Sequence, residues 1–447
     1  MLRAETPMKL LVFAHTPPPH HGQSYMVQLM VEGFGGDRRK RRKARAAAAG
    51  GRQSSGDAAA AGGDFGIECY HVNARLSRRL EEIGDLRVGK FLVLLWYCLQ
   101  AIWCRFRYGV TTFYYIPAPG KRSALYRDWV VMFICRPFFK RMVLHWHAAG
   151  LAKWLEIVVG MRHRSITYRL MKQVDLSIVL SRYNRADAEK LFSRHVRVVS
   201  NGIPDPAPRF EKEVLPRRQA RFAARCKLLA GGRLSAAEEQ AAGGDPHVVK
   251  VLYLAHCTRE KGLFDSLAAA SLAAERLSER QAPVSIRLLI AGGFVTAAEE
   301  SEFTHLMAVP AVAQMVQYLG FVSGDQKNNL LREADLFCFP TYFQNENQPV
   351  NLIEAMAFGL PILTTRWRSL PELFPAGYPG LVGIRSPQEL ADALLALMTR
   401  ESGEGFRDIF LRSFTLERHL QGLADAFLQS QADVPAARTA AQGAGSG

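Results

Sequence analysis

The sequence predicts an α/β protein with two Rossmann-like, doubly wound domains, each built on a parallel sheet. Its 447 residues exceed what one ordinary core organises, and 48% of them are hydrophobic, enough for two sizeable cores. In both halves, short and nearly continuous apolar segments alternate with longer amphipathic segments. This alternation is typical of parallel strands covered by helices on both faces.

The strand candidates form two groups separated by a stretch without clear apolar periodicity. In the first half we expect strands at 9–14, 67–72, 112–116, 142–146, 176–179 and 196–199. In the second half we expect them at 249–255, 286–291, 317–319, 336–339 and 361–364. Ligands of such sheets bind outside the carboxyl ends of the strands, so the residues that follow each strand are the first candidates for a site.

Composition sets the expected domain limits. We expect a first domain over 1–206, a linker with some helix over 207–246 and a second domain over 247–405. A helix within 406–434 would pack back toward the first domain, and 435–447 would be a frayed tail. Residues 37–64, rich in Ala, Gly and Arg, are expected to be a disordered insertion.

The net charge of +16 raises the alternative of a non-catalytic basic protein that binds nucleic acid. Residues 37–57 carry a net charge of +6 and residues 207–227 a net charge of +5, and neither segment resembles part of a core. We therefore expect the basic excess to lie mostly on tails and loops. A nucleic-acid-binding protein would need it on ordered surfaces, so we expect no nucleic-acid partner.

The cysteines and the apolar segments indicate a cytoplasmic protein. The seven cysteines are scattered, odd in number and never in a C-x-x-C pair, which argues against a disulfide framework or a zinc site. The apolar run 10–14 is too short for a signal peptide. The longest apolar stretch, 91–103, falls short of the roughly 20 residues of a membrane span.

The most informative segment is 342–363, with the sequence YFQNENQPVNLIEAMAFGLPIL. It follows the predicted strand 336–339. Pro349 suits the first helical position, Gly359 suits the C-terminal cap, and Pro361 prevents the helix from continuing. A helix of about three turns should therefore begin beside a strand end. Its unpaired amide groups would form an anion site suited to a diphosphate.

Two glutamates accompany this predicted anion site. Glu346 lies in the loop before the helix, and Glu354 lies within an otherwise apolar stretch of it. A carboxylate beside a phosphate site is badly placed unless it accepts hydrogen bonds from hydroxyl groups, which sugars and riboses supply in pairs. The alternative is that both glutamates only complement the helix dipole. Their spacing favours a binding role.

The pattern E-N-Q-P-x4-E-A-M-A-x-G-x-P, which contains Glu346 and Glu354, resembles the signature of the family 4 retaining glycosyltransferases. That resemblance implies the GT-B fold, with two facing Rossmann-like domains and an interdomain cleft. It implies that Glu354 binds the donor ribose and that Glu346 holds the donor sugar as a catalytic residue. The donor sugar and phosphate would also contact four residues of the loop and helix start: Asn347, Gln348, Pro349 and Val350.

A second segment, 251–262, reads as a strand that leads into a helix, with Lys261 at the turn. The resembled family places an Arg and a Lys here, five residues apart, to neutralise the departing nucleotide diphosphate. Lys261 fits the lysine, whereas His256 stands at the arginine position. Arg259 is nearby and could substitute, the alternative being a solvated turn charge.

The first domain should supply the acceptor side. Gly22 ends the Pro- and His-rich loop after the first strand, which resembles the family's glycine-bearing first loop. His147 closes the fourth strand and matches the family's histidine near the donor sugar, whereas His145 is expected to point into the domain. The turn Asn201-Gly202 resembles the turn that ends the first domain, and its expected role is geometric.

Two segments, 91–108 and 129–141, mix aromatic and aliphatic residues with arginines. Such helices could lie on an anionic bilayer and give a peripheral contact with the inner face of a membrane. The sequence favours the alternative, in which both are buried helices that flank the first sheet.

These features together predict a glycosyltransferase that moves a sugar from a UDP- or GDP-sugar to a glycan or lipid-linked acceptor with retention of configuration. No cofactor is expected, because the nucleotide sugar is a substrate. No metal is expected either, because the chain has no Asp-x-Asp motif, and Lys261 with the helix amides would stabilise the leaving diphosphate. The main alternative is a nucleotide-sugar epimerase of similar architecture, which should show more acid and base groups than His147 and the two glutamates.

Overall fold

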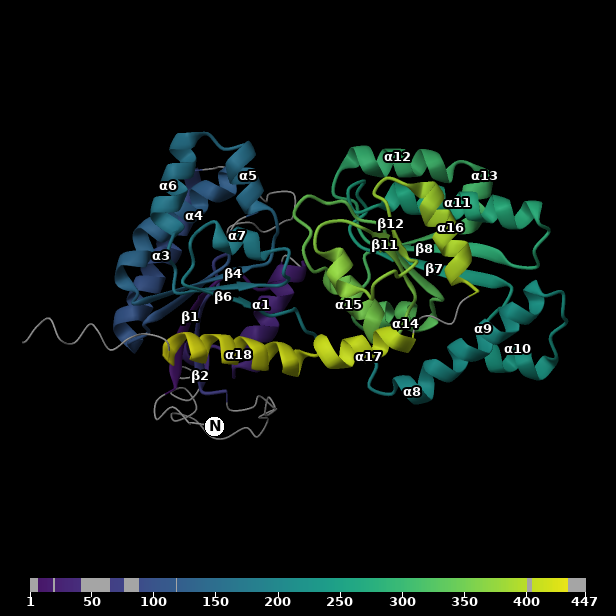
Figure 1. Cartoon of the computed structure of the whole chain (residues 1–447), viewed down its shortest axis with the longest axis horizontal. Coiled ribbons are helices and arrows are strands. Elements are labelled where there is room, and N and C mark those ends of the chain that lie inside the picture. Colours follow the sequence, from purple (N-terminus) through teal and green to yellow (C-terminus); the bar gives the residue numbers. More distant parts are fainter. Residues whose placement is uncertain are drawn as a thin grey trace, which may run out of the picture. The chain divides into compact units, whose positions relative to one another are not determined.

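The computed structural model describes residues 7–18, 21–41, 65–75, 88–117, 119–399 and 404–432. The chain divides into two compact units (Figure 1). Unit 1 comprises Met1–Leu180, Asn184–Val199 and Glu417–Gly447, and unit 2 comprises Ser181–Tyr183 and Ser200–Leu416. Each unit contains one six-stranded parallel sheet, so the predicted pair of doubly wound α/β domains is confirmed.

The sheet of unit 1 has the strand order β2-β1-β3-β4-β5-β6. Its strands are β1 (Met8–Phe13), β2 (Ile67–Val72), β3 (Thr112–Tyr115), β4 (Arg141–Trp146), β5 (Leu176–Val179) and β6 (His195–Val198). The chain passes from β1 to β2 on one side and then returns to β3 on the other. The topological switch point of this sheet therefore lies between β1 and β3.

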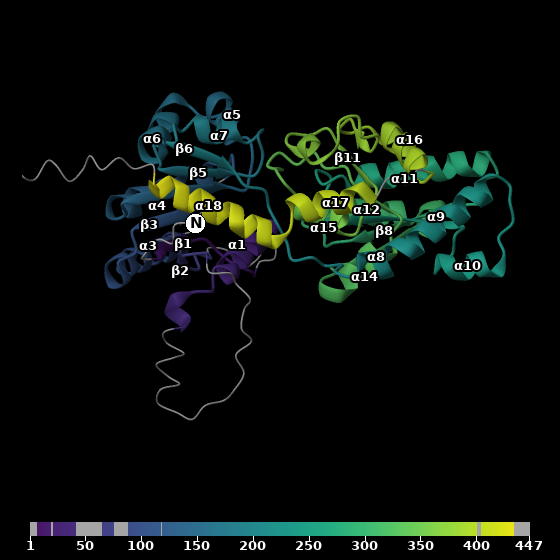
Figure 2. The same cartoon turned by 60° about the horizontal axis from the view of Figure 1, so that its bottom comes forward.

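Helices cover both faces of this sheet because neighbouring residues of a strand point to opposite sides. On β3, the Tyr115 hydroxyl donates to Asp128 of α4 (Arg122–Cys135) at 2.6 Å. The adjacent Tyr114 instead lies 6.2 Å, between ring centroids, from Phe427 of α18 (Leu416–Ala432). α18 lies along the sheet of unit 1 (Figure 2).

The helix expected within 406–434 is α18, and one further helix, α17 (Glu404–Ser413), precedes it in the other unit. α17 packs against α15 (Val350–Ala357) in unit 2, whereas α18 belongs almost wholly to unit 1. α18 also packs closely on α1 (Gly22–Gly33). A Cβ atom built on Gly33 would lie 2.4 Å from Leu420 Cδ1, so a larger residue here would require the Leu420 side chain to move.

The sheet of unit 2 has the order β12-β11-β10-β7-β8-β9. Its strands are β7 (Val248–Leu254), β8 (Ser285–Ala291), β9 (Val316–Gly320), β10 (Leu336–Phe339), β11 (Ile362–Thr365) and β12 (Leu381–Val382). The chain moves outward from β7 to β9 and then returns to β10 on the other side of β7. The switch point therefore lies between β7 and β10. Each predicted strand ends within one residue of its expected bounds, and only the two-residue β12 was not predicted.

The remaining elements are mostly the crossovers that connect these strands. In unit 1 they are α3 (Val88–Tyr108), η1 (Arg136–Phe138), α5 (Leu151–Ile157), α6 (Met161–Met171) and α7 (Arg185–Glu189). In unit 2 they are α11 (Leu263–Glu279), α12 (Ala297–Met307), α13 (Pro310–Met315), α14 (Gly324–Glu333), η2 (Leu370–Leu373) and α16 (Pro387–Leu397). Over the described part of the chain, no helix has the length and apolarity that crossing a membrane requires.

Residues 207–246, expected to be a linker, instead fold as part of unit 2. They form α8 (Phe210–Glu213), α9 (Leu215–Leu229) and α10 (Ala236–Ala242). Arg221 and Arg225 of α9 are buried and pair with Asp335 at 3.1 and 3.0 Å. Burial alone would raise the pKa of Asp335, but Arg225 and Arg221 lower it. The basic residues of this segment are therefore partly structural, and the expectation that they only decorate a loop is corrected.

The expected insertion 37–64 begins too early. Asp37 is buried, and its carboxylate accepts a hydrogen bond from the backbone amide of His71 at 3.2 Å. The Arg39 guanidinium also donates to Asp37, at 3.1 Å. Residues 37–41 therefore belong to the fold of unit 1. Residues 42–64 and the predicted tail 435–447 lie outside the described residues.

Candidate functional site

Lys261 and Glu346 form an ion pair at the switch point of the unit 2 sheet. Lys261 follows β7 and Glu346 follows β10, and these two strands are neighbours. The Lys261 Nζ atom lies 2.6 Å from Glu346 Oε2, and the two side chains are only 20% and 8% exposed. Two residues that the sequence analysis assigned to one site from separate motifs are therefore in direct contact.

A glycine explains how the loop that carries Lys261 comes so close to the loop after β10. Gly262 caps α11 with a φ of +84°, a conformation that L side chains rarely adopt. A Cβ atom at this position would lie 2.4 Å from the carbonyl oxygen of Pro340. Only glycine therefore allows the two loops to pack against each other, and this packing brings Lys261 to Glu346.

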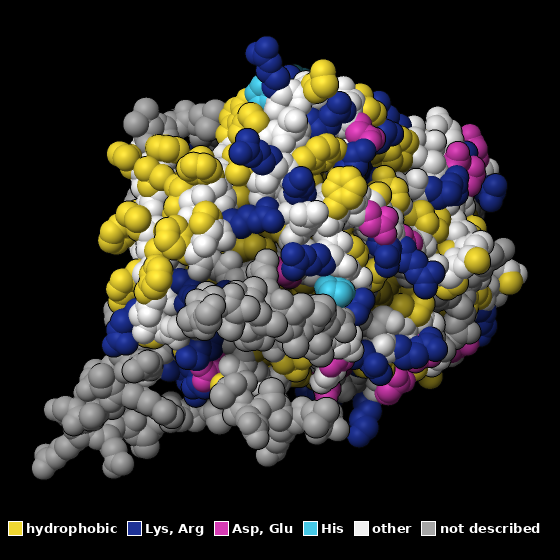
Figure 3. Space-filling view, turned by 60° about the vertical axis from the view of Figure 1, so that its left-hand side comes forward, with side chains coloured by type: hydrophobic (Ala, Val, Ile, Leu, Met, Phe, Trp, Pro, Cys, Tyr) yellow, Lys and Arg dark blue, Asp and Glu magenta, His cyan; other side chains and the backbone are white. Residues whose placement is uncertain are grey.

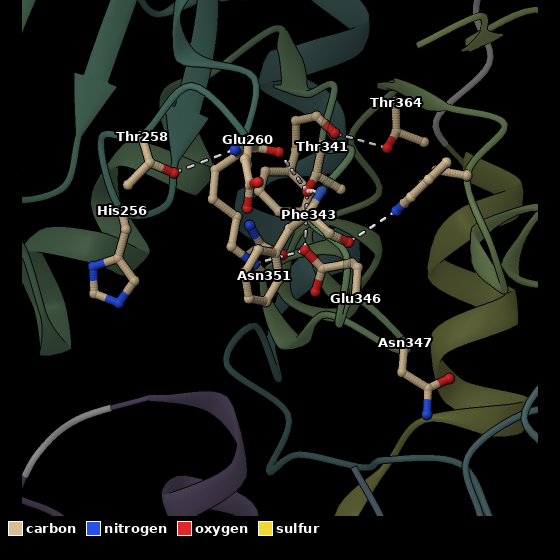
Figure 4. A network of polar contacts seen from close by, with 12 residues as sticks. His256, Thr258, Glu260, Thr341, Phe343, Glu346, Asn347, Asn351 and Thr364 are labelled. Carbon is tan, nitrogen blue, oxygen red and sulfur yellow. Dashed lines mark hydrogen bonds and ion pairs between the residues drawn. The ribbon is translucent and has the colours of Figure 1, made fainter. Parts of the chain in front are cut away.

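Glu346 is held in place from its own loop as well. The Thr341 hydroxyl donates to Glu346 Oε2 at 3.0 Å, and Figure 4 shows these two side chains together. The Lys261 ammonium group also lies 4.5 Å from the ring centroid of Phe343, a cation–π distance. Because both described contacts use Oε2, the carboxylate is oriented by one of its oxygens.

Glu354 lies in the second turn of α15 and pairs with Lys327 of α14. The side chain of Glu354 is 11% exposed and that of Lys327 is 27% exposed. Lys327 could not be predicted from the sequence, because the helix that carries it has no motif and its sequence distance from Glu354 is not a helical spacing. The structure thus pairs each of the two glutamates with its own lysine.

The helix α15 differs slightly from its prediction. Pro349 is the N-cap residue, Val350 is the first helical residue, and the helix has eight residues, about two turns rather than three. Gly359 has the left-handed φ of +59° expected after a helix C-terminus. The side-chain amide of Asn351 donates to the carbonyl oxygen of Leu254 at 2.8 Å and fixes the start of α15 to the end of β7. The sequence analysis did not identify this contact.

The side chains of Asn347 and Gln348 are engaged by protein partners. The Ser181 hydroxyl donates to Asn347 Oδ1 at 3.2 Å, and in Figure 4 the Asn347 side chain points away from Glu346. Gln348 Oε1 accepts from the Asn201 amide at 2.5 Å, and the Asn201 side chain donates to the Gln348 carbonyl at 3.0 Å. Asn201 thus holds this loop through hydrogen bonds, whereas neither it nor Gly202 has the left-handed backbone on which its expected geometric role rested. These side chains position the loop before α15.

The two residues considered for the missing arginine lie in different surroundings. His256 is half-buried, and burial, followed by the charge of Lys261, lowers its pKa. Arg259 is exposed, pairs with Glu302 of α12 and lies 4.6 Å from the ring centroid of Phe264. Its side chain therefore faces α12, whereas Lys261 faces Glu346. In Figure 4 the His256 ring also lies apart from Glu346.

In unit 1, the predicted residues Gly22 and His147 each follow a strand. Gly22 is the first residue of α1, directly after the N-cap His21, whose Nδ1 atom accepts from the Ser24 amide at 3.3 Å. His147 follows β4 and lies 4.2 Å, between ring centroids, from His145.

His145 points into the domain, as expected. It is 1% exposed, and its Nδ1 atom is 2.6 Å from the Tyr114 hydroxyl. The ring of His419, on α18, lies 6.5 Å from that of His145.

His15, His145 and His147 are neutral at physiological pH. Burial, with smaller contributions from His419 and His21, lowers the pKa of His147 to about 3. Burial likewise lowers the pKa of His15, which contacts His21 at 2.8 Å, to about 4. His147 can therefore exchange hydrogen bonds with hydroxyl groups but is not a cation near pH 7. No role was predicted for His21, although it lies in the Pro- and His-rich first loop, or for His419, which belongs to no motif.

Within the part of the chain that the structure describes, no group of three or more His, Cys, Asp or Glu side chains is placed to hold a metal ion.

Solved structures share this fold. HepE from Anabaena, in complex with UDP-glucose, aligns with a TM-score of 0.56 and 14% identity over 94% of this chain and 100% of that chain. Sucrose-phosphate synthase from Thermosynechococcus elongatus aligns with a TM-score of 0.61 and 16% identity over 96% of this chain and 100% of that chain. With the two parallel sheets, these likenesses confirm the predicted GT-B fold class of two Rossmann-like domains.

Curated relatives match part of the chain. The amylovoran biosynthesis glycosyltransferase AmsK of Erwinia amylovora is 28% identical over 165 residues, which are 36% of this chain and 37% of the relative. The putative colanic acid biosynthesis glycosyltransferase WcaL of Escherichia coli K12 is 27% identical over 161 residues, which are 35% of this chain and 37% of the relative. The chain thus matches just over a third of the length of these relatives.

The family model described as glycosyl transferases group 1 matches residues 248–400. This match gives no support to the alternative that the protein is a nucleotide-sugar epimerase. The matched segment contains Lys261, Glu346 and Glu354, together with the strands β7 and β10 that position them. Residues 248–400 of this chain are therefore similar to group 1 glycosyl transferases.

Proposed function

We propose that this protein is a retaining glycosyltransferase that uses a nucleotide-sugar donor. The observation that carries the proposal is the contact between Lys261 and Glu346, 2.6 Å apart at the switch point of the unit 2 sheet. A cation, a carboxylate and a helix N-terminus meet there, at the edge where doubly wound sheets bind ligands. The match of residues 248–400 to glycosyl transferases supports this assignment.

The ion pair suggests how the donor binds. Lys261 and the amides at the start of α15 would bind the diphosphate, which carries more negative charge than one carboxylate. The diphosphate would therefore compete with Glu346 for the Lys261 ammonium group. Glu346, which Thr341 still holds at 3.0 Å, would then accept hydrogen bonds from the donor sugar. Exchange of partners at Lys261 thus couples diphosphate binding to sugar binding.

Glu354 would bind the ribose of the donor. It is buried to 8% exposure on α15, one turn beyond the helix start where the diphosphate would lie. A buried carboxylate that accepts two hydroxyl groups needs a nearby cation to offset the cost of burial, and Lys327 supplies that charge. The nucleotide base, that of UDP or GDP, would extend beyond this pair.

Transfer would need no metal, because Lys261 and the helix amides stabilise the charge that develops on the leaving diphosphate. The leaving phosphate would assist the incoming hydroxyl on the same face of the sugar, which retains the anomeric configuration. His147, neutral because burial lowers its pKa to about 3, would exchange hydrogen bonds with substrate hydroxyls. It would not act as a charged acid near pH 7.

The acceptor is proposed to be a glycan or a lipid-linked sugar. The names of the relatives AmsK and WcaL place them in amylovoran and colanic acid biosynthesis, which favours an acceptor of polysaccharide-building type here as well. The hydroxyl-binding capacity of neutral histidines beside β1 and β4 suits such an acceptor.

A thermal-shift titration with UDP, GDP and their sugars tests the donor assignment. Ligand at a hundredfold over its dissociation constant should stabilise the protein by about 2.7 kcal/mol. Lys261→Met should abolish the shift. The matched control is Lys250→Met, which removes a lysine from an exposed pair with Glu333 in the same unit. The proposal fails if no nucleoside diphosphate or nucleotide sugar stabilises the wild-type protein.

A further inference from the structure

The helix α3 in unit 1 is apolar on two opposite faces. One face, with Leu94, Cys98, Ala101 and Cys104, is buried in the core beside the sheet. The other face carries Leu92, Trp96, Leu99, Trp103 and Phe106, whose exposures are 61%, 60%, 57%, 53% and 68%. Their spacing of three or four residues places all five on one side of the helix. The expectation that this segment is a buried helix is therefore correct for only one of its faces.

The exposed face continues onto η1, which follows α4 in the chain. The ring of Phe138, in η1, is 41% exposed and lies 6.1 Å from the ring of Phe106. The Arg105 guanidinium donates to the Phe138 carbonyl at 2.9 Å and holds the two segments together. We call Leu92, Trp96, Leu99, Trp103, Phe106 and Phe138 the apolar stripe. Figure 3 shows hydrophobic side chains gathered on this side of unit 1, with Lys and Arg side chains beside them.

The part of unit 1 that carries the stripe is strongly basic. Residues 88–172 contain fourteen Lys or Arg and two Asp or Glu, a net charge of +12. Of the two acids, Asp128 is buried against Tyr115, and Glu156 pairs with Lys190. This positive charge lies on ordered helices, which corrects the expectation that the basic excess lies mostly on tails and loops.

A stripe of this length is not ordinary surface. Single exposed apolar residues are common, but a contiguous row of tryptophan, leucine and phenylalanine along a helix indicates an interaction site. A second copy of this chain would bring the same positive charge to the contact, so symmetric self-association through this face would be opposed by repulsion. The partner that fits is apolar at its centre and negatively charged around it.

We propose that the apolar stripe of α3 and η1 docks unit 1 on an anionic lipid bilayer. The helix would lie in the plane of the interface with its leucines and phenylalanines among the acyl chains. Trp96 and Trp103 would lie at the level of the headgroups, which indole side chains prefer. The lysines and arginines near the stripe would bind the anionic headgroups. Docking would depend only on exposed residues of unit 1, so it can be tested independently of the proposed transferase activity.

Co-sedimentation with vesicles tests the inference on the full chain. We expect binding to vesicles that contain phosphatidylglycerol, weaker binding at high salt, and little binding to pure phosphatidylcholine. Trp96→Ser with Trp103→Ser should reduce binding to anionic vesicles by about tenfold or more. The matched control is Phe321→Ser, which removes an equally exposed aromatic side chain from unit 2, 66% exposed.

A second pair of variants separates charge from apolar contact. Arg107→Gln with Lys140→Gln should weaken binding to anionic vesicles, whereas Arg233→Gln with Arg280→Gln, at exposed sites of unit 2, should not. Each variant should keep the wild-type melting temperature. Equal binding to neutral and anionic vesicles, no binding to either, or a stripe-dependent dimer in sedimentation velocity would each overturn the proposal.

Discussion

Lys327 of α14 forms an ion pair with Glu354 of α15, and Lys261 pairs in the same way with Glu346. Each of the two glutamates that the sequence singles out thus has its own cation. The pairs differ in origin, because Lys261 belongs to a recognisable turn and Lys327 to a helix without a motif. The two glutamates therefore have separate electrostatic surroundings, and substitutions at them should have separate effects.

Glu354→Gln should weaken the binding of the nucleoside diphosphate and of the intact donor by similar factors. If Glu354 binds the ribose, both ligands lose a charge-assisted hydrogen bond, which is worth about 1.5–3 kcal/mol, or roughly ten- to hundredfold in affinity. If Glu346 binds the sugar, Glu346→Gln should weaken binding of the intact donor only, because the nucleoside diphosphate lacks the sugar and the loss of the carboxylate charge frees Lys261 for the diphosphate. Calorimetric titration of both variants with both ligands measures these four affinities.

The matched control for both variants is Glu333→Gln, which breaks an exposed pair with Lys250. If Glu346→Gln and Glu354→Gln leave both affinities within about twofold of wild type, the glutamates only complement the helix dipole, and the donor assignment is wrong.

Transfer should persist in excess chelator. In the proposed reaction, Lys261 and the start of α15 would supply the positive charge that stabilises the leaving diphosphate, which a metal supplies elsewhere. We expect Lys261→Met to lower the turnover rate far more than chelation does. Product formation with and without EDTA, in wild type and in the Lys261→Met variant, is the measurement. Activity lost with EDTA and restored by manganese would refute this role of Lys261.

The strands and the helix that carries Glu354 could be predicted from the sequence because both leave local signals. Buried parallel strands are short apolar runs, and Pro349 and Gly359 mark the ends of α15. Contacts that only the tertiary fold creates could not be predicted, whether or not their residues belong to a motif. Lys327, Asn201 with Gln348, and the histidines at 21 and 419 are brought together only by the tertiary fold.

The segment 207–246 was expected to be a linker but folds as part of unit 2, and the reason for this error is different. Its arginines and alanines have weak apolar periodicity, so it resembles a linker in sequence. Its helix α9 is nevertheless fixed by Arg221 and Arg225, which are buried against Asp335. Charged side chains that pair inside a fold are indistinguishable in sequence from charged side chains on a surface.

Gly262→Ala should destabilise unit 2 and weaken donor binding together. The added methyl group would lie 2.4 Å from the Pro340 carbonyl oxygen, at a residue whose φ is +84°. Overpacking and left-handed backbone strain each cost about 1–3 kcal/mol. Thermal melting and donor titration measure both effects. Gly293→Ala, where a Cβ meets nothing within 4 Å, is the control and should melt like wild type.

Replacing residues 42–64 by a short Gly-Ser linker should leave the melting temperature and the donor affinity unchanged. The prediction rests on their Ala-, Gly- and Arg-rich composition. A replacement that starts at residue 37 should instead lower the melting temperature, because it removes the Asp37 carboxylate that accepts from the His71 amide at 3.2 Å. Loss of cooperative unfolding in the shorter replacement would show that residues 42–64 contribute to the core.

Unit 1 should lose stability as the pH falls below about 6.5. Burial lowers the pKa of His147 to about 3 and that of His15 to about 4 in the folded chain, below the ordinary value of 6.5. Between these values the unfolded chain binds more protons than the folded one, so the free energy of unfolding falls as the pH falls. His147→Asn should flatten this dependence by removing one such group, whereas His305→Asn, at an exposed site on α12, should not. Melting temperatures measured from pH 7 down to pH 4 test this, and identical pH profiles for wild type and His147→Asn would show that burial of His147 does not govern the acid sensitivity of the fold.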